Sequence, residues 1–240
     1  MMGKIICAGL GPGDPELMSI KANRFIRNAS QIAYFCKKNT KGQARMIVEG
    51  MLREDVDEYP MRYPLTTEIS FHSEAYRTAL ARFYEDCAEK MIALSKQDDV
   101  VVLCEGDPFF YGSYMHLYTR LLGKVDQEII PAITGMSGCW SATGKPITWG
   151  DDILSILMGT LEEEQLTLRL QQTDAAVIMK TGNNLPKIRR ALQNAGQYEK
   201  AWLVIKGTMA DQQVMKLTDF EQDVCPYFSI ILIHGEGRRP

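Results

Sequence analysis

The sequence predicts an α/β protein of two domains whose sheets are mainly parallel, and three observations support this fold class. Short apolar runs of strand type recur along the whole chain, at residues 4–8, 31–36, 100–104, 153–157, 175–179, 201–205 and 228–233. Helical stretches separate most of these runs, and alternating strands and helices are typical of parallel sheets. The pattern also restarts after Pro131, so we expect one domain at residues 1–125 and a second at residues 126–240.

The clearest single element is a long helix at residues 71–95. Apolar side chains recur about every four residues from Ala75 to Ile92, as they do on one face of a helix. Ser70 is the expected N-cap, because a serine oxygen can accept a hydrogen bond from the first turn. Shorter helices are predicted at residues 19–28, 42–52, 113–122, 161–171 and 185–194. The Pro- and Tyr-rich segment 59–64 has no clear period and is interpreted as an ordered loop.

The composition is that of an ordinary globular protein, with 45% hydrophobic and 24% charged residues. No apolar run approaches the ~20 residues of a membrane-spanning helix. The N-terminus lacks the basic and small-residue pattern of a signal peptide. The net charge of -3 argues against non-specific nucleic-acid binding, which depends on a basic surface. We therefore expect a cytoplasmic protein that binds neither nucleic acid nor a membrane.

The cysteines and histidines show no metal-ligand spacing. None of the six cysteines forms a C-x-x-C pair, and most lie in apolar stretches, so reduced and buried thiols are predicted. The three histidines are scattered, and His72 and His116 are expected on helix surfaces. We predict no bound metal.

A local basic stretch stands out in a chain that is acidic overall. It comprises Lys37, Lys38, Lys41, Arg45, Arg53 and Arg62. Such a cluster can hold a small polyanionic ligand, and it can equally be a solvated basic surface. Both interpretations are open at this point.

Three loops rich in small residues each follow a strand-like run. The first reads Gly-Leu-Gly-Pro-Gly-Asp-Pro at residues 9–15, where glycines let the backbone turn sharply and approach a ligand. A dinucleotide site would give a similar pattern. However, Pro15 delays the following helix, and the run 31–36 ends without the acid that would hold a ribose. A purely structural turn is the other alternative.

The second loop, Glu-Gly-Asp-Pro-Phe-Phe-Tyr-Gly at residues 105–112, follows the most apolar run of the chain. Ligands of open α/β sheets bind at the carboxyl ends of strands. There, Asp107 can accept hydrogen bonds from a ribose or an amine, and Phe109 or Phe110 can face an apolar group. The alternative is that Asp107 is a cap and the aromatic rings belong to the core. The third loop, Pro-Ala-Ile-Thr-Gly-Met-Ser-Gly at residues 131–138, fits a ligand contact or a capped helix N-terminus.

Taken together, the three loops resemble the signature of the tetrapyrrole methylases, in order and spacing, from Gly3 to about His234. This resemblance implies two α/β domains, usually in a homodimer, with S-adenosylmethionine in the trough between the domains. It also implies the cofactor contacts, which are Pro12, Glu105, Gly106, Asp107, Phe110, Thr134, Gly135, Met179, Lys180 and Gly207. The chain departs from many relatives in having Glu105 in place of a glycine and Ala132 after Pro131.

Within the family, residues 105–121 and 137–152 most resemble the members that methylate C-20 of precorrin-2. The alternatives are a cobalt-loaded macrocycle or another precorrin position as the target. From other classes, an NADP-dependent oxidoreductase or a nucleotide-sensing regulatory domain would fit the first loop alone. Methyl transfer from a sulfonium needs positioning and exclusion of water more than acid or base help, and we assign no catalytic side chain.

Overall fold

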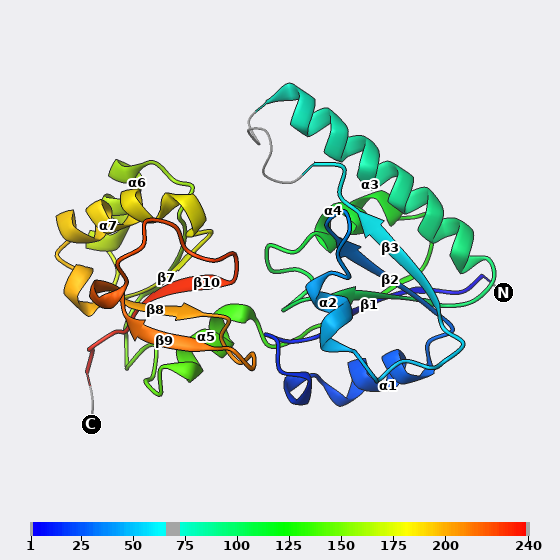
Figure 1. The fold of residues 1–240 in the computed structure, drawn as a ribbon, viewed down its shortest axis with the longest axis horizontal. Coiled ribbons are helices and arrows are strands. Elements are labelled where there is room, and N and C mark those ends of the chain that lie inside the picture. The colour runs from blue at the N-terminus through cyan, green and yellow to red at the C-terminus, as the bar shows by residue number, and fades with distance from the viewer. Residues whose placement is uncertain (1, 66–72, 239–240) are drawn as a thin grey trace. The chain divides into compact units, whose positions relative to one another are not determined.

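The computed structural model describes residues 2–65 and 73–238, which form two compact units, Met1–Thr134 and Gly135–Pro240. Each unit contains one five-stranded sheet with helices on its faces (Figure 1). The division falls later than the expected position 125. The reason is that strand β5 (Gln127–Ile130) pairs with β1 (Ile5–Gly9) and so completes the first sheet.

The sheet of the first unit is entirely parallel, in the order β3-β2-β4-β1-β5. Its other strands are β2 (Gln31–Cys36), β3 (Asp57–Arg62) and β4 (Val100–Cys104). All residues of β1 and β4 are buried, as expected for central strands that helices cover on both faces. Because the strands are parallel, the loops that follow β4, β1 and β5 emerge side by side at one edge.

Alternate residues of the central strands face two separate layers of the core. Ile6 and Val101 pack with α1 (Ile20–Asn28) and α2 (Gln43–Ile47) on one face. Ile5 and Val102 pack with α3 (Glu74–Ser95) and α4 (Tyr114–Leu121) on the other face. Figure 1 shows α3 and α1 on opposite sides of this sheet. This alternation follows from the two-residue period of a strand.

Three local predictions need correction or restriction. Residues 59–64 were expected to form a loop, but most of them belong to β3, an edge strand paired with β2. The edge position tolerates Pro60, which cannot donate to a ladder. The expected helix at 42–52 is only the short α2, and Gly50 adopts a φ of 74° in the turns that follow. The N-cap of α3 is Ser73, while Ser70 and His72 lie outside the described residues.

The second sheet is mixed rather than parallel, in the order β6-β7-β10-β8-β9. Its strands are β6 (Leu154–Met158), β7 (Ala175–Met179), β8 (Trp202–Ile205), β9 (Gln213–Lys216) and β10 (Ser229–Ile233). Only β6 and β7 pair in parallel, and the three remaining pairings are antiparallel. Over the described chain five of eight pairings are parallel. The predicted fold class, two α/β domains with mainly parallel pairing, is confirmed for the molecule, and the second sheet contributes the antiparallel pairings. An apolar run fixes that a strand forms, not its direction.

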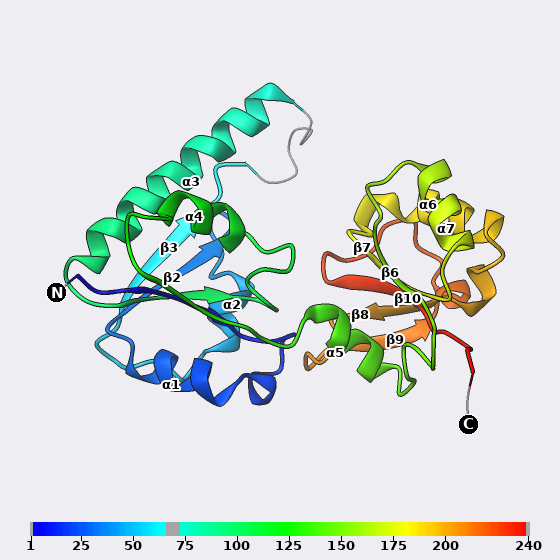
Figure 2. The same ribbon diagram turned by 180° about the vertical axis from the view of Figure 1, so that it is seen from behind.

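Helices cover both faces of this sheet (Figure 2). On one face, α6 (Glu163–Gln171) and α7 (Leu185–Asn194) pack on Ile178, Leu203 and Ile231. On the other, α5 (Gly135–Ala142) packs on Val177, Val204 and Leu232. Short 3-10 turns complete the described chain at Pro15–Leu17, Gly182–Asn184, Tyr198–Lys200 and Leu217–Asp219. No helix in the described part of the chain is both long and apolar enough to cross a membrane.

Candidate active site

The first and second glycine-containing loops are joined directly to each other in the first unit. The backbone N–H of Gly106 donates to the carbonyl of Gly11 at 2.8 Å, and the N–H of Leu10 donates to the carbonyl of Cys104 at 2.9 Å. Gly11 and Gly106 also form an isolated antiparallel bridge. Both have positive φ, 81° and 62°, a conformation that glycine adopts without strain. The two loops thus form one rigid element at the carboxyl edge of the sheet.

Asp107 ties the second loop to the third. One carboxylate oxygen accepts from the N–H of Phe109 at 2.9 Å, and the other accepts from the N–H of Ala132 at 3.0 Å. Asp107 therefore does cap backbone N–H groups, which was one of its two expected roles. Each oxygen keeps a second lone pair, so these bonds do not remove its capacity to accept from a ligand.

Gly9 brings the strand ends into close approach. A Cβ atom placed on Gly9 would lie 2.7 Å from the Cβ of Ala132, 2.9 Å from the carbonyl oxygen of Ile130 and 2.9 Å from Cδ of Pro108. No real side chain tolerates such separations. Gly9 therefore sets the spacing among the three loops, a role that sequence analysis did not assign to it.

The aromatic residues of the second loop divide into exposed and buried groups. Phe109 and Tyr111 are 46% and 54% exposed. Phe110 stacks edge-on against Tyr111 at 4.9 Å. In contrast Tyr114 is fully buried, and its hydroxyl donates to Gln127 at 2.8 Å. Of the two rings weighed for a ligand contact, Phe109 is exposed and Phe110 is half-buried, whereas Tyr114 is a core residue.

Glu105 has an unusual electrostatic environment. Solvent reaches its side chain, yet the protein atoms around it disfavour the charged form and raise its pKa to about 7. A hydrogen bond from the backbone of Ala44, in the first turn of α2, acts in the opposite direction and lowers the pKa. Burial is the larger of the two effects, so the pKa of Glu105 is raised overall.

The remaining predicted contacts lie at loop and strand ends of each unit. Pro12 is buried between Gly11 and Gly13, and Thr134 is half-buried at the end of the first unit. In the second unit Gly135 begins α5, and a Cβ there would meet no atom within 4 Å. Backbone beside open space of this kind allows a ligand to approach closely.

Two strand ends of the second unit carry strained backbone. Lys180 follows β7 with a φ of 56°, while Lys206 and Thr208 follow β8 with φ of 52° and 70°. A residue other than glycine in this left-handed backbone conformation destabilises the fold by about 1–3 kcal/mol, and such residues cluster at functional sites. Gly207 lies between Lys206 and Thr208. Packing requires a glycine there, since a Cβ atom would lie 2.7 Å from the sulfur of Cys139.

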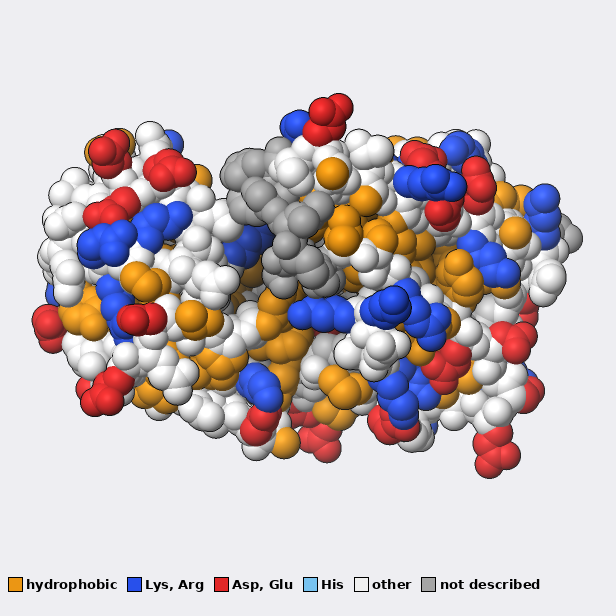
Figure 3. Space-filling view, turned by 45° about the horizontal axis from the view of Figure 1, so that its top comes forward, with side chains coloured by type: hydrophobic (Ala, Val, Ile, Leu, Met, Phe, Trp, Pro, Cys, Tyr) orange, Lys and Arg blue, Asp and Glu red, His pale blue; other side chains and the backbone are white. Residues whose placement is uncertain are grey.

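The basic stretch of the first unit is largely neutralised. Arg45 pairs with Glu58 at 2.8 Å and with Glu49 at 3.0 Å, Arg53 pairs with Asp55, and Lys41 pairs with Glu49. Figure 3 shows Lys and Arg side chains beside Asp and Glu on the face of this unit that it draws. Within the described residues, Lys38 and Arg62 have no ion-pair partner.

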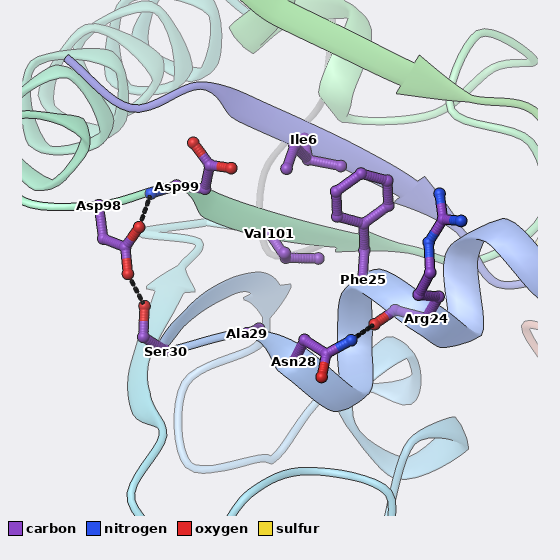
Figure 4. A pocket seen from close by; sticks show the side chains of 9 residues that line it. All are labelled: Ile6, Arg24, Phe25, Asn28, Ala29, Ser30, Asp98, Asp99 and Val101. Atoms are coloured by element: carbon purple, nitrogen blue, oxygen red, sulfur yellow. Dashed lines mark hydrogen bonds between the residues drawn. The ribbon is translucent and has the colours of Figure 1, made fainter. Parts of the chain in front are cut away.

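A cavity of about 250 Å³ lies elsewhere in the first unit (Figure 4). Its lining includes Ser30, Asp98 and Asp99, which precede β2 and β4 and so lie at the amino ends of these strands. The Asp98 carboxylate accepts from the Ser30 hydroxyl at 2.6 Å and from the Asp99 N–H at 2.8 Å. The cavity is therefore separate from the loop cluster at the carboxyl ends of the strands.

A family comparison identifies the protein class. The family model described as Tetrapyrrole (Corrin/Porphyrin) Methylases matches residues 4–221. The chain belongs to the tetrapyrrole methylases. It is accordingly a methyltransferase, which confirms the predicted family and enzyme class. The oxidoreductase and regulatory-domain alternatives are excluded.

Individual relatives agree with this assignment. The methylase is 48% identical over 240 residues to a precorrin-2 C(20)-methyltransferase from Sinorhizobium sp, covering 100% of this chain and 98% of that protein. It is 24% identical to a cobalt-precorrin-2 C(20)-methyltransferase from Salmonella typhimurium, with 98% of each chain covered. A Thermus thermophilus uroporphyrin-III C-methyltransferase, solved with S-adenosylhomocysteine, shares its fold with a TM-score of 0.64 at 18% identity. That likeness covers 96% of this chain and 97% of the other.

Sequence analysis of this methylase missed the residues whose role depends on packing. The sequence indicates only a turn at Gly9. The turn Lys206-Gly207-Thr208 matches the family's contacts, but nothing in the sequence shows that Lys206 and Thr208 have positive φ. A glycine that ends a buried strand next to two other loops is the signal that could have singled out Gly9. No sequence signal marks a positive φ at lysine.

Proposed function

We propose that this methylase transfers a methyl group from S-adenosylmethionine to C-20 of precorrin-2 and thereby acts in cobalamin biosynthesis. The observation that carries the proposal is the 48% identity along the whole chain to a precorrin-2 C(20)-methyltransferase. The resemblance of residues 105–121 and 137–152 to such enzymes supports the same position.

The loops are suited to hold the methyl donor. The contacts that we propose are the ten residues named from the family pattern. Two features of the structure favour them: the open space beside Gly135 and the rigid junction of Gly11 with Gly106. The Thermus relative was solved with the demethylated form of this donor. When bound, S-adenosylmethionine supplies an electrophilic methyl group on a sulfonium with a neutral leaving group.

The protein's contribution is positioning. Asp107 fixes the second loop against the third through two backbone hydrogen bonds, and this holds the exposed rings of Phe109 and Tyr111 in place. Aromatic rings stack on flat conjugated ligands. A methyl transfer loses about a hundredfold in rate for a displacement of about 1 Å. Rigid loops of this kind are therefore what the reaction requires.

Lys38 and Arg62 are the basic residues that we assign to the substrate carboxylates. They lie at the ends of β2 and β3, on the same edge of the sheet as the loops, and lack ion-pair partners within the described residues. Arg45 and Arg53 are already paired with carboxylates of the chain and are not assigned.

The metal-free macrocycle is the favoured substrate, because identity to the enzyme named for precorrin-2 is twice that to the enzyme named for cobalt-precorrin-2. We further propose that the enzyme works as a cytoplasmic homodimer, as the family resemblance suggests. Light scattering of the purified chain tests the dimer, and a monomer at working concentration would contradict it.

The decisive experiment uses precorrin-2 and a carbon-13 methyl donor. We expect one new methyl signal on a meso carbon and a mass increase of one methyl group. A parallel reaction with the cobalt-loaded macrocycle should be slower. A label on a pyrrole carbon, or turnover of the cobalt-loaded form alone, would overturn the assignment.

A further inference from the structure

Two ammonium groups lie against one tryptophan ring in the second unit. Trp202 begins β8, and its ring centre is 4.5 Å from Nζ of Lys145 and 4.7 Å from Nζ of Lys216. One cation over an indole ring is a common stabilising contact. Two cations on the same ring, however, lie within about 10 Å of each other, the screening length at 0.1 M salt. They therefore repel each other, and this repulsion requires an explanation.

The contacts of the two lysines include no carboxylate of the described chain. Lys216 donates to the carbonyl oxygen of Glu199 at 3.1 Å, which is a neutral acceptor. Within the described residues neither Lys145 nor Lys216 has an ion-pair partner. The contrast with neighbouring Lys200 is clear, since that residue pairs with Glu236 at 3.0 Å.

His234 lies beside the segment that carries Lys145, since it contacts Pro146, the next residue. Its Nδ1 is 2.9 Å from the carbonyl oxygen of Pro146, and its Nε2 is 3.2 Å from the Thr143 hydroxyl. That hydroxyl also lies 2.7 Å from the carbonyl of Trp140, which takes its single hydrogen. Both ring nitrogens therefore face acceptors, an arrangement that only the protonated imidazole satisfies fully.

The surroundings nevertheless lower the pKa of His234. Burial lowers its pKa, and so do Lys145 and Lys216, against an opposing effect of the Pro146 carbonyl. Lys145 and Lys216 are the charged groups that lower this pKa. The Asp152 carboxylate packs against Gly235, the residue that follows His234. A negative charge beside the two lysines would relieve the repulsion and favour the protonated ring.

We propose that Lys145, Lys216 and His234, grouped around Trp202, bind a small oxyanion of the carboxylate or phosphate type. Charge-assisted hydrogen bonds from two ammonium groups favour such a ligand. The indole ring supplies one apolar wall. We call this cluster the Trp202 site.

The Trp202 site is distinct from the strand ends proposed for the methyl donor. Trp202 pairs with Leu232 and Lys216, at the edge where β8 begins. Met179 and Gly207 lie at or beyond the opposite ends of β7 and β8. The inference therefore does not depend on the proposed function.

Titration of the full chain with inorganic phosphate and, separately, with citrate tests the site. The Trp202 indole resonance should shift saturably with at least one of them, and the tighter anion identifies the ligand class. Lys145→Gln and Lys216→Gln should each weaken binding about tenfold. Lys124→Gln, which removes the same charge from an exposed residue of the first unit, should leave it unchanged.

The pH dependence provides a second readout. Relative to His234→Gln, the wild type should bind the same anion more tightly as the pH falls from 8 to 6, since the bound anion raises the pKa of His234. This comparison removes the titration of phosphate and citrate themselves. A linear, non-saturating shift with both anions would overturn the proposal. Equal affinities in the Lys145, Lys216 and Lys124 variants would overturn it as well.

Discussion

Replacing Gly9 with alanine is the sharpest test of how the loop cluster is built. The added methyl carbon would lie 2.7 Å from the Cβ of Ala132 and 2.9 Å from both the Ile130 carbonyl and Cδ of Pro108. Carbon atoms normally approach to about 3.5–4.0 Å, so the contact with Ala132 is short by about 1 Å. A backbone carbonyl and a proline ring cannot rotate away.

The cost should therefore be near the upper end of the range for overpacking, about 2–3 kcal/mol. For a chain of this size, 1 kcal/mol shifts the melting temperature by about 2–4 °C. We expect the melting temperature of the chain to fall by about 4–12 °C. Affinity for S-adenosylhomocysteine should also fall, because the three loops are pushed apart.

Gly135→Ala is the matched control, since its methyl group would meet no atom within 4 Å. Its stability should be unchanged or raised by up to about 1 kcal/mol, because alanine is the better helix former. If Gly135 contacts the methyl donor, the affinity of the Gly135→Ala protein for S-adenosylhomocysteine should still fall. A Gly9→Ala protein with the melting temperature of the wild type would refute the packing argument.

The other predictions concern the ligands and the charges. Gly106→Val places a β-branched residue at a φ of 62° and should weaken S-adenosylhomocysteine binding by tenfold or more, about 1.4 kcal/mol; unchanged calorimetry would remove that loop from the site. Charge reversal of Lys38 and Arg62 should raise the KM for the macrocycle without changing donor affinity. Arg53→Glu should change neither the KM nor the donor affinity. An equal effect on both ligands would count against the assignment. The pKa of Glu105 is raised to about 7, so between its ordinary value of 4.5 and pH 7 the folded state binds more protons at this carboxyl than the unfolded state does. Stability should thus decline as the pH rises from about 4.5 to 7 and level off above that, and this slope should be absent from a denaturation series of Glu105→Gln. Chelator treatment should leave methyl transfer intact, and a stoichiometric metal lost together with activity would refute the metal-free prediction.

The sequence by itself determined the elements whose signal is local. The buried strand β4 and helix α7 lie at the predicted residues, because a continuous apolar run and a helical period are each visible in a few consecutive residues. The family was equally accessible, since three short loops in fixed order carry it.

Only the tertiary structure decided how these elements combine. β3 becomes a strand because β2 offers it a partner edge, and β10 inserts antiparallel between β7 and β8, which no single segment encodes. Arg45 is removed from the candidate ligand contacts because the fold places Glu58 beside it. The same holds for the role of Gly9 and for the two lysines at Trp202. Each depends on which groups distant in sequence become neighbours, and that is fixed by packing rather than by local propensity.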